Sequence, residues 1–293
     1  MLKGSLVALV TPFYFDGGVD YDTLGGLIEY HLQSNTDGFV ILGTTGEAAT
    51  MSFEERLEVV KFSARVIKKR VPLIIGAGSN DTNQALKNAY EFSRAGADYL
   101  LVVTPYYNKT NDNGLIRHYE KIASVSACPI ILYNVPSRTG MNISINVIEK
   151  LSRNKNIIGI KEASGNMSYS MKVAQYLSDD FLMFAGNDDI IVPMMSIGCS
   201  GVISVLANIA PTQVHNMCMH CLNNEYDKAI KINNELLDVA NGLFIDTNPI
   251  PVKEAMNLLG YGVGGLRLPL YPMEFADKEK LVSILNAKKD VIF

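Results

Sequence analysis

Two side chains have the types and the spacing that Schiff-base chemistry needs. Lys161 ends the apolar run 157–161, and Tyr133 ends the preceding apolar run 129–133. A lysine in a partly desolvated pocket favours its neutral amine, which attacks carbonyl carbon, and a nearby phenol can move the protons of imine and enamine formation. Gly159 shares the direction of Lys161 along the strand and is expected to leave space beside it. The plain alternatives are a solvated lysine and ordinary aromatic packing.

Two further groups have the chemistry of carboxylate binding. Thr44 and Thr45, between two glycines, offer hydroxyls and backbone N–H groups next to an expected helix start, which suits a small anion. Simple helix capping explains the same residues. Arg138, on the loop after Tyr133, has the guanidinium fork that binds a second carboxylate in bidentate fashion, whereas an exposed arginine is ordinarily just solvated.

An alternation of apolar runs and helical segments must position these residues. Nearly continuous Val, Ile and Leu is typical of parallel strands buried on both faces. The eight runs are 6–11, 39–43, 73–77, 99–104, 129–133, 157–161, 181–185 and 202–205. This pattern predicts an α/β fold, a closed (β/α)₈ TIM barrel with its active site at the carboxyl ends of the strands. A doubly wound open sheet is the alternative, because periodicity does not reveal closure.

The strand pattern stops near residue 222. We therefore divide the chain into a barrel with the active site, residues 1–222, and a C-terminal helical region packed on it, residues 223–293. Helices are expected over 225–240, 251–259 and 278–287. The glycine-rich segment 260–265 is interpreted as a plain loop, because no strand precedes it as a dinucleotide-binding turn requires.

Composition and motifs exclude several classes of function. Lys plus Arg is 26 against 30 for Asp plus Glu, and this net charge of −4 argues against binding to nucleic acid or to an anionic membrane. No apolar run approaches the roughly 18 residues of a membrane span, and the N-terminus lacks the pattern of a signal peptide, so a cytoplasmic protein is expected. No histidine ends a strand, Cys218 and Cys221 have no second pair, and no phosphate loop occurs. We expect neither metal nor cofactor.

Four motifs resemble, in order and spacing, those of the dihydrodipicolinate synthase (4-hydroxy-tetrahydrodipicolinate synthase) family, and the similarity extends over the whole chain. They are Gly-Thr-Thr-Gly-Glu at 43–47, Thr-Pro-Tyr-Tyr-Asn-Lys at 104–109, Tyr-Asn-Val-Pro at 133–136 and Ile-Lys-Glu-Ala-Ser at 160–164. The resemblance implies a hydro-lyase of the class I, metal-free type. Such an enzyme condenses pyruvate with L-aspartate 4-semialdehyde, the entry step of diaminopimelate and lysine biosynthesis.

The resemblance also implies a role for individual residues. Lys161 would form the Schiff base with pyruvate. The proton relay would consist of Tyr133, Thr44 and Tyr107, with Tyr107 crossing from the neighbouring subunit of a homotetramer built as a dimer of dimers. The substrate-binding groups implied are Thr45 for the pyruvate carboxylate, Arg138 for the carboxylate of the semialdehyde, and the main chain at Gly186 and Ile203.

Sister enzymes share the lysine and leave alternatives open. N-acetylneuraminate lyase and the 2-keto-3-deoxy sugar-acid aldolases differ in the aldehyde that meets the enamine. The segments 104–107 and 137–140 favour an acidic aldehyde. A barrel that binds a keto acid without catalysis is a further alternative, although such a protein would not need a lysine and phenols together.

The resemblance places an allosteric cleft at the dimer contact. Its residues are Ala49, Phe53, Arg56, Asn80, Gln84 and Tyr106. Family members that lysine inhibits have a histidine at the position of Arg56 and a glutamate at that of Gln84. A fixed positive charge facing cationic lysine, with no compensating carboxylate, predicts weak or absent lysine feedback.

Overall fold

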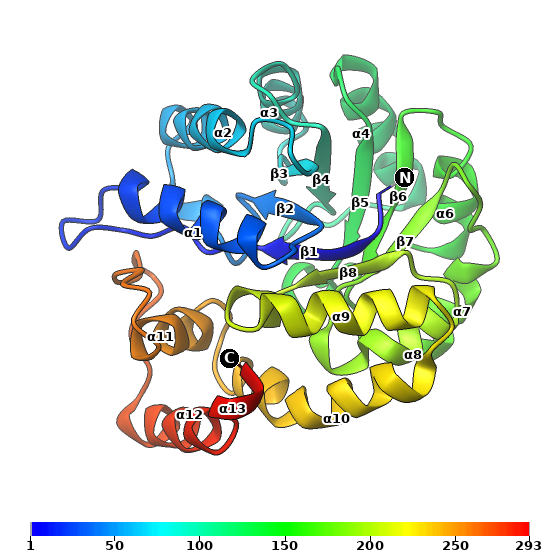
Figure 1. The fold of residues 1–293 in the computed structure, drawn as a ribbon. Coiled ribbons are helices and arrows are strands. Elements are labelled where there is room, and N and C mark those ends of the chain that lie inside the picture. Colours follow the sequence, from blue (N-terminus) through cyan, green and yellow to red (C-terminus); the bar gives the residue numbers. More distant parts are fainter. Residues whose placement is uncertain (1, 293) are drawn as a thin grey trace.

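Eight parallel strands close into a barrel in the computed structural model, which describes residues 2–292 (Figure 1). The strands are β1 Gly4–Ala8, β2 Gly38–Ile41, β3 Leu73–Gly76, β4 Tyr99–Val103, β5 Ile130–Asn134, β6 Ile157–Glu162, β7 Leu182–Ala185 and β8 Gly201–Ser204. Each pairs with its neighbour in chain order, and β1 pairs with β8. The predicted TIM barrel is confirmed and the open doubly wound sheet is excluded.

The strands are buried on both faces, as their apolar sequences predict. Alternate residues such as Leu6, Ile131 and Phe184 fill the barrel interior, whereas residues such as Val7 and Phe39 face the surrounding helices and join a second, larger core. A strand between two apolar layers has no solvent face that polar residues would occupy. The 48% hydrophobic content therefore reflects two concentric layers of packing.

Helices follow the strands and cover the outside of the barrel. They are α1 Tyr21–Gln33, α2 Phe53–Ile67, α3 Thr82–Arg94, α4 Asp112–Val125, α5 Pro136–Thr139, α6 Ile145–Leu151, α7 Met167–Ala174, α8 Ile191–Ser196 and α9 Pro211–Leu222, with the short 3₁₀ helices η1 Ala48–Thr50, η2 Asp188–Ile190 and η3 Leu206–Asn208. The Ser52 side chain accepts from the Glu55 N–H, and the Glu55 carboxylate accepts from the Ser52 N–H, so α2 starts in a capping box. Cys218 and Cys221 lie on the buried face of α9, and burial raises the pKa of the Cys221 thiol to about 11.

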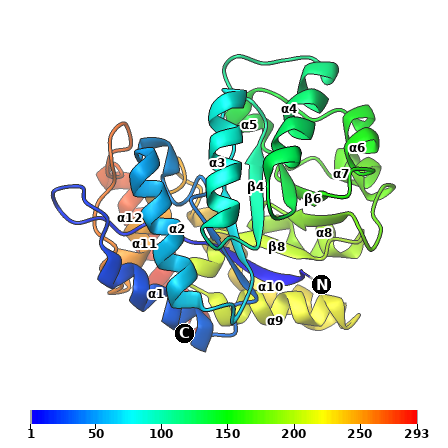
Figure 2. The same cartoon turned by 90° about the horizontal axis from the view of Figure 1, so that it is seen from above.

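The C-terminal region consists of α10 Tyr226–Gly242, α11 Ile250–Leu258, α12 Phe275–Ala287 and α13 Lys289–Ile292. These helices lie along one side of the molecule, where α10 packs on α8 and α9 (Figure 1). Figure 2 shows α11 and α12 at the end of the molecule opposite α6 and α7, as Figure 1 does. The expected helices are present, but α12 begins at Phe275 rather than at residue 278, because no side-chain cap marks its start, and the four-residue α13 was not predicted. The domain boundary at residue 222 stays a prediction.

The segment 260–265 contains no helix, and it packs as a loop against the N-terminal part of the chain. Gly264 has φ +72° and pairs with Phe13 in an isolated parallel bridge. A side chain at Gly264 would place its Cβ 1.8 Å from the Phe13 carbonyl oxygen, so only glycine fits there. Within residues 2–292, no helix is both long enough and apolar enough to cross a membrane.

Candidate active site

Lys161 and Tyr133 lie side by side on neighbouring strands. The β5–β6 register pairs Tyr133 directly with Lys161, and the lysine Nζ lies 4.6 Å from the centre of the tyrosine ring. Both side chains are nearly excluded from solvent, at 6% exposed for Lys161 and 8% for Tyr133. No hydrogen bond or ion pair within residues 2–292 engages the amine. The amine is therefore sheltered, uncommitted and next to a phenol, which is the arrangement that Schiff-base formation needs.

Gly159 does not leave open space beside Lys161, so that expectation was wrong. A Cβ at Gly159 would lie 2.4 Å from the Leu182 carbonyl oxygen on β7. The backbone of the adjacent strand fills the space, and glycine allows β6 and β7 to approach closely. The residue thus serves strand packing rather than the lysine pocket.

Buried carboxyl groups fasten the strand ends around Lys161. The Glu162 carboxylate accepts from the Asn134 side chain at 2.7 Å and from the Ser164 N–H at 2.7 Å, which ties the end of β6 to that of β5. Burial raises the pKa of Glu162 above its usual range, although these hydrogen bonds act in the opposite direction. The carboxylate therefore relies on its donors to remain ionised.

Asp188 links the ends of β7 and β8, as Glu162 links those of β5 and β6. Its Oδ2 accepts from the N–H groups of Val205 and Leu206, both at 2.9 Å. Burial raises the pKa of Asp188, while hydrogen bonds and the charge of Lys161 oppose that shift. This bridge holds the ends of the two strands that carry Gly186 and Ile203 at fixed positions.

Gly186 directly follows β7, and Ile203 lies within β8. The Gly186 N–H donates to the Glu162 carbonyl at 2.7 Å, and a Cβ there would come within 2.5 Å of the Ala163 Cβ. Ile203 is fully buried in the barrel interior, in the same cluster as Tyr133. The contact of both residues with substrate stays a prediction.

Thr44 and Thr45 form a tight turn after β2. The Gly46 N–H donates to Gly43 O and the Glu47 N–H to Thr44 O, each at 3.1 Å. The element that follows is the three-residue helix η1, and α2 starts only at Phe53, so the expected helix start beside the threonines is a single 3₁₀ turn. Anion binding at this turn must therefore depend on the hydroxyls and nearby N–H groups rather than on a helix dipole.

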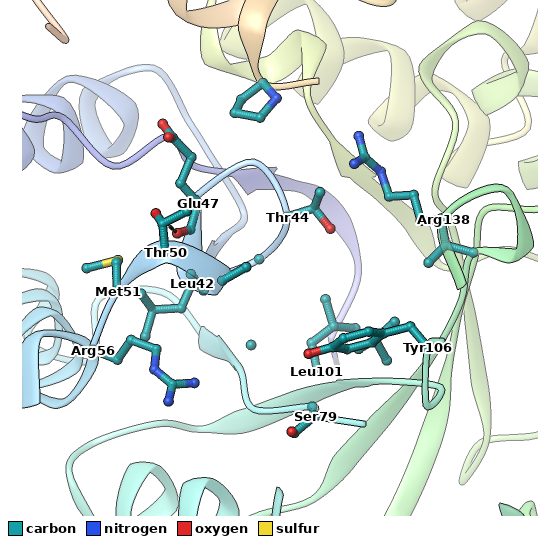
Figure 3. A pocket seen from close by; sticks show the side chains of 18 of the residues that line it. Leu42, Thr44, Glu47, Thr50, Met51, Arg56, Ser79, Leu101, Tyr106 and Arg138 are labelled. Atoms are coloured by element: carbon teal, nitrogen blue, oxygen red, sulfur yellow. Dashed lines mark hydrogen bonds between the residues drawn. The ribbon is translucent and has the colours of Figure 1, made fainter. Parts of the chain in front are cut away.

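The cavity next to this turn has a volume of about 580 Å³. Thr44, Leu101, Val135 and Arg138 line it, and Leu101 and Val135 belong to the interior cluster that contains Tyr133. Figure 3 shows Arg138 and Tyr106 reaching in from one side and Arg56 from the other. Lys161 and Tyr133 do not line this cavity themselves. The cavity thus borders the packing around the reactive pair.

Arg138, on α5, has an exposed guanidinium at the mouth of this cavity. Its Nη2 donates to the main-chain oxygen of Asn248 at 2.8 Å. Its Nε and Nη1 have no hydrogen-bond partner in the part of the chain that the structure describes. One edge of the guanidinium is therefore anchored, and the remaining donors can bind an incoming carboxylate.

The two tyrosines after β4 point in different directions. Tyr106 lines the cavity, whereas Tyr107 is 94% exposed and has φ +69°. A single chain therefore brings Thr44, Arg138 and Tyr106 to one cavity but does not bring Tyr107 to it. The crossing of Tyr107 into a neighbouring subunit stays a prediction.

The predicted allosteric cleft is only partly assembled around the same cavity. Its residues Ala49, Arg56, Gln84 and Tyr106 line the cavity. Phe53 instead stacks on Phe92 at 5.8 Å, and the Asn80 carbonyl accepts from the Asn108 side chain. Phe53 and Asn80 do not line the cavity.

A buried ion pair that supports the Thr44–Thr45 turn was not predicted from the sequence. Glu47 Oε1 accepts from Lys253 Nζ at 2.8 Å and Oε2 from the Arg267 N–H at 3.0 Å. Both ion-pair side chains are almost completely buried, and burial lowers the pKa of Lys253 while Glu47 opposes the shift. Asn248, which contacts Thr45 and Arg138, was missed as well. The Asn-Pro dipeptide at 248–249 signals a turn but not what the turn contacts.

The carboxyl-terminal face of a TIM barrel is where enzymes of this fold hold their active sites, and the lysine–tyrosine pair lies at that face. The fold and the site thus define a TIM-barrel enzyme. The model of the dihydrodipicolinate synthetase family matches residues 1–288. The chain is 48% identical over 274 residues to the 4-hydroxy-tetrahydrodipicolinate synthase of Clostridium perfringens (strain SM101 / Type A). The matched region covers 94% of each chain.

Solved structures agree with the sequence comparison. The chloride-inhibited dihydrodipicolinate synthase from Acinetobacter baumannii, complexed with pyruvate, superimposes with a TM-score of 0.96 at 40% identity and covers 99% of each chain. A monomeric dihydrodipicolinate synthase variant gives a TM-score of 0.95 at 35% identity, over 98% of this chain and 97% of the other. This chain belongs to the dihydrodipicolinate synthetase family.

Proposed function

We propose that the chain condenses pyruvate with L-aspartate 4-semialdehyde to give 4-hydroxy-tetrahydrodipicolinate, through a Schiff base on Lys161. The observation that carries the proposal is the sheltered Lys161 amine, which no carboxylate engages, beside the Tyr133 ring. The relatives named 4-hydroxy-tetrahydrodipicolinate synthase support this activity, and the pyruvate complex of the Acinetobacter baumannii enzyme supports the first substrate. The product belongs to diaminopimelate and lysine biosynthesis.

The steps follow from the groups present. The Lys161 amine attacks the ketone carbon of pyruvate, and loss of one water gives the imine. Removal of a methyl proton, through a relay of Tyr133 and Thr44 with Tyr107, gives the enamine. The enamine carbon attacks the aldehyde carbon of the semialdehyde, whose amino group then displaces Lys161 from the imine carbon and closes the ring. The net balance is two substrates to one product and one water, with no oxidant or reductant.

The relay and the pocket would be completed by a second copy of the chain. Tyr107 is an exposed aromatic residue with a left-handed backbone, features typical of a residue held by contacts outside its own chain. We assign it to the site of a neighbouring subunit in a homotetramer. Because the family includes a monomeric variant, sedimentation velocity must establish the assembly of this protein.

Arg138 should decide which aldehyde the enamine meets, because its uncommitted donors face the cavity mouth. We expect Arg138→Ala to raise the KM for aspartate semialdehyde about 10- to 100-fold, the loss of a charge-assisted hydrogen-bonded contact, with the pyruvate KM within about twofold. A coupled assay that compares aspartate semialdehyde with sugar aldehydes measures both constants and separates this activity from the sugar-acid aldolases. Arg153→Ala, which removes an exposed arginine on the α6 side, is the matched control. Preference for a neutral sugar aldehyde in the unmodified enzyme would overturn the proposed substrate.

Lysine feedback should be weak because of the charge in the lining of the cavity. The only hydrogen bond of the Arg56 side chain among residues 2–292 is from Nε to the Ser52 carbonyl at 3.4 Å, which leaves its positive charge without a carboxylate partner. Gln84 binds Asn88 and is neutral. We expect less than half inhibition at about 1 mM lysine, and increased sensitivity in the double variant Arg56→His/Gln84→Glu, which removes the fixed positive charge and adds a carboxylate. Submillimolar inhibition of the unmodified enzyme would contradict this expectation.

A further inference from the structure

Asn248 connects the two carboxylate-binding groups of the site from a distant part of the chain. It lies in the segment between α10 and α11, and its side chain is only 6% exposed. Its Nδ2 donates to Thr45 Oγ1 at 3.1 Å, and its main-chain oxygen accepts from Arg138 Nη2 at 2.8 Å. One residue of the C-terminal region therefore touches both Thr45 and Arg138, the groups that the family resemblance assigns to the two substrate carboxylates.

The side-chain contact determines what the Thr45 hydroxyl can do. A hydroxyl has one proton to donate and two lone pairs to accept with. Because Asn248 occupies a lone pair and Thr45 Oγ1 makes no other hydrogen bond within residues 2–292, the hydroxyl proton is uncommitted. Thr45 is 3% exposed, so solvent does not compete for that proton. A donor held in this way is suited to a carboxylate, and the Asn248 N–H strengthens it by polarising the hydroxyl.

The main-chain contact is of a different kind. The Asn248 carbonyl holds one edge of the Arg138 guanidinium and does not depend on the identity of the side chain. Changing the side chain should therefore affect Thr45 and leave Arg138 in place. This separation makes the two contacts distinguishable by kinetics.

From these contacts we infer that Asn248 is a positioning residue for pyruvate binding: its side-chain amide orients the Thr45 hydroxyl as a donor to the pyruvate carboxylate. The inference rests on the proposed function, because it assigns a role to a group of the same site. Asn248 touches no reacting atom and takes no part in bond making.

The test is steady-state kinetics of Asn248→Ala and Asn248→Asp in the full-length protein. We expect Asn248→Ala to raise the pyruvate KM about five- to tenfold, the effect of one lost hydrogen bond, with kcat and the KM for aspartate semialdehyde within about twofold. Asn248→Asp has the same shape but adds a negative charge close to the pyruvate carboxylate, so its pyruvate KM should rise by about a hundredfold at pH 8. Relative to the unmodified enzyme, that increase should shrink as the pH is lowered, because a protonated carboxyl regains a hydrogen to donate.

Two controls separate this role from a structural one. Asn257→Ala removes another side-chain amide of the same region, which donates to Gly264 O, and should leave all three constants unchanged. In a Thr45→Val background, Asn248→Ala should add less than about twofold to the pyruvate KM, because the group it orients is gone. The melting temperature of each variant reports its folding independently of kinetics, and the isosteric Asp variant decides the question if the Ala variant does not fold.

The outcomes are distinct. Parallel changes in kcat and both KM values, or a pyruvate KM of Asn248→Asp with the same pH dependence as the unmodified enzyme, would overturn the positioning role. If the unmodified enzyme itself makes no product from pyruvate and aspartate semialdehyde, the proposed function fails instead. Measuring the unmodified enzyme first distinguishes these two failures.

Discussion

Replacing Lys161 with alanine is expected to lower kcat/KM by about 10⁴-fold or more, because no other group can form the imine that activates pyruvate. The amine is buried, lies 4.6 Å from the centre of the Tyr133 ring and forms no hydrogen bond or ion pair in the described chain. The same variant should lose covalent trapping. Borohydride with pyruvate should convert the unmodified enzyme to a stable secondary amine at Lys161, visible by mass spectrometry of the intact chain and of its peptides.

Two variants serve as controls for this prediction. Lys161→Arg keeps the positive charge but cannot form the imine, so it should be as inactive as Lys161→Ala. Lys172→Ala removes an exposed lysine on α7 and should keep both activity and trapping. A borohydride adduct that persists in Lys161→Ala would show that another lysine carries the chemistry.

The second large effect is on stability and comes from the buried Lys253–Glu47 pair. Lys253→Met should lower the free energy of unfolding by about 3–5 kcal/mol, because it leaves the Glu47 carboxylate buried without its cation. Glu47→Gln should cost less, since burial already lowers the pKa of Lys253 and the lysine can release its proton once the carboxylate is gone. The double variant Glu47→Gln/Lys253→Met should recover much of the loss. Urea unfolding at neutral pH measures all three.

An exposed ion pair of the same region provides the matched comparison. Lys278 pairs with Glu254 at the surface, and Lys278→Ala should cost less than about 1 kcal/mol. If Lys253→Met cost no more than Lys278→Ala, the buried pair would not be the anchor of the Thr44–Thr45 turn.

The reactive pair was predictable because it depends on local pattern. The consecutive apolar runs 129–133 and 157–161 end in Tyr133 and Lys161, and in a parallel sheet consecutive strand ends meet at the same edge, so these two residues were expected to be neighbours. The sequence left open whether the sheet closes into a barrel, and the structure shows that it does. The number and order of strands were read correctly because strands buried on both faces are uniformly apolar.

The support of the site was not predictable, for a physical reason. Glu47 and Lys253 are 206 residues apart, and Thr45 and Asn248 are 203 apart. Contacts at such separation follow from the path of the chain and leave no periodic signal in either segment. The prediction for Gly159 was wrong for a different reason. A glycine in a strand indicates that space beside it is limited or needed, but the sequence does not say whether a pocket or the backbone of the next strand lies there.

The ties between the Thr44–Thr45 turn and residues 248–267 bear on how the protein matures during synthesis. All eight barrel strands have been translated once residue 204 emerges, yet Glu47 and Thr45 still lack their partners until Asn248, Lys253 and Arg267 follow. Because these contacts close loops that span most of the chain, we expect them to form late in folding. During translation, Lys161 is therefore made well before the residues that support the Thr44–Thr45 turn. We expect the chain to bind substrate only after Asn248, Lys253 and Arg267 have been added.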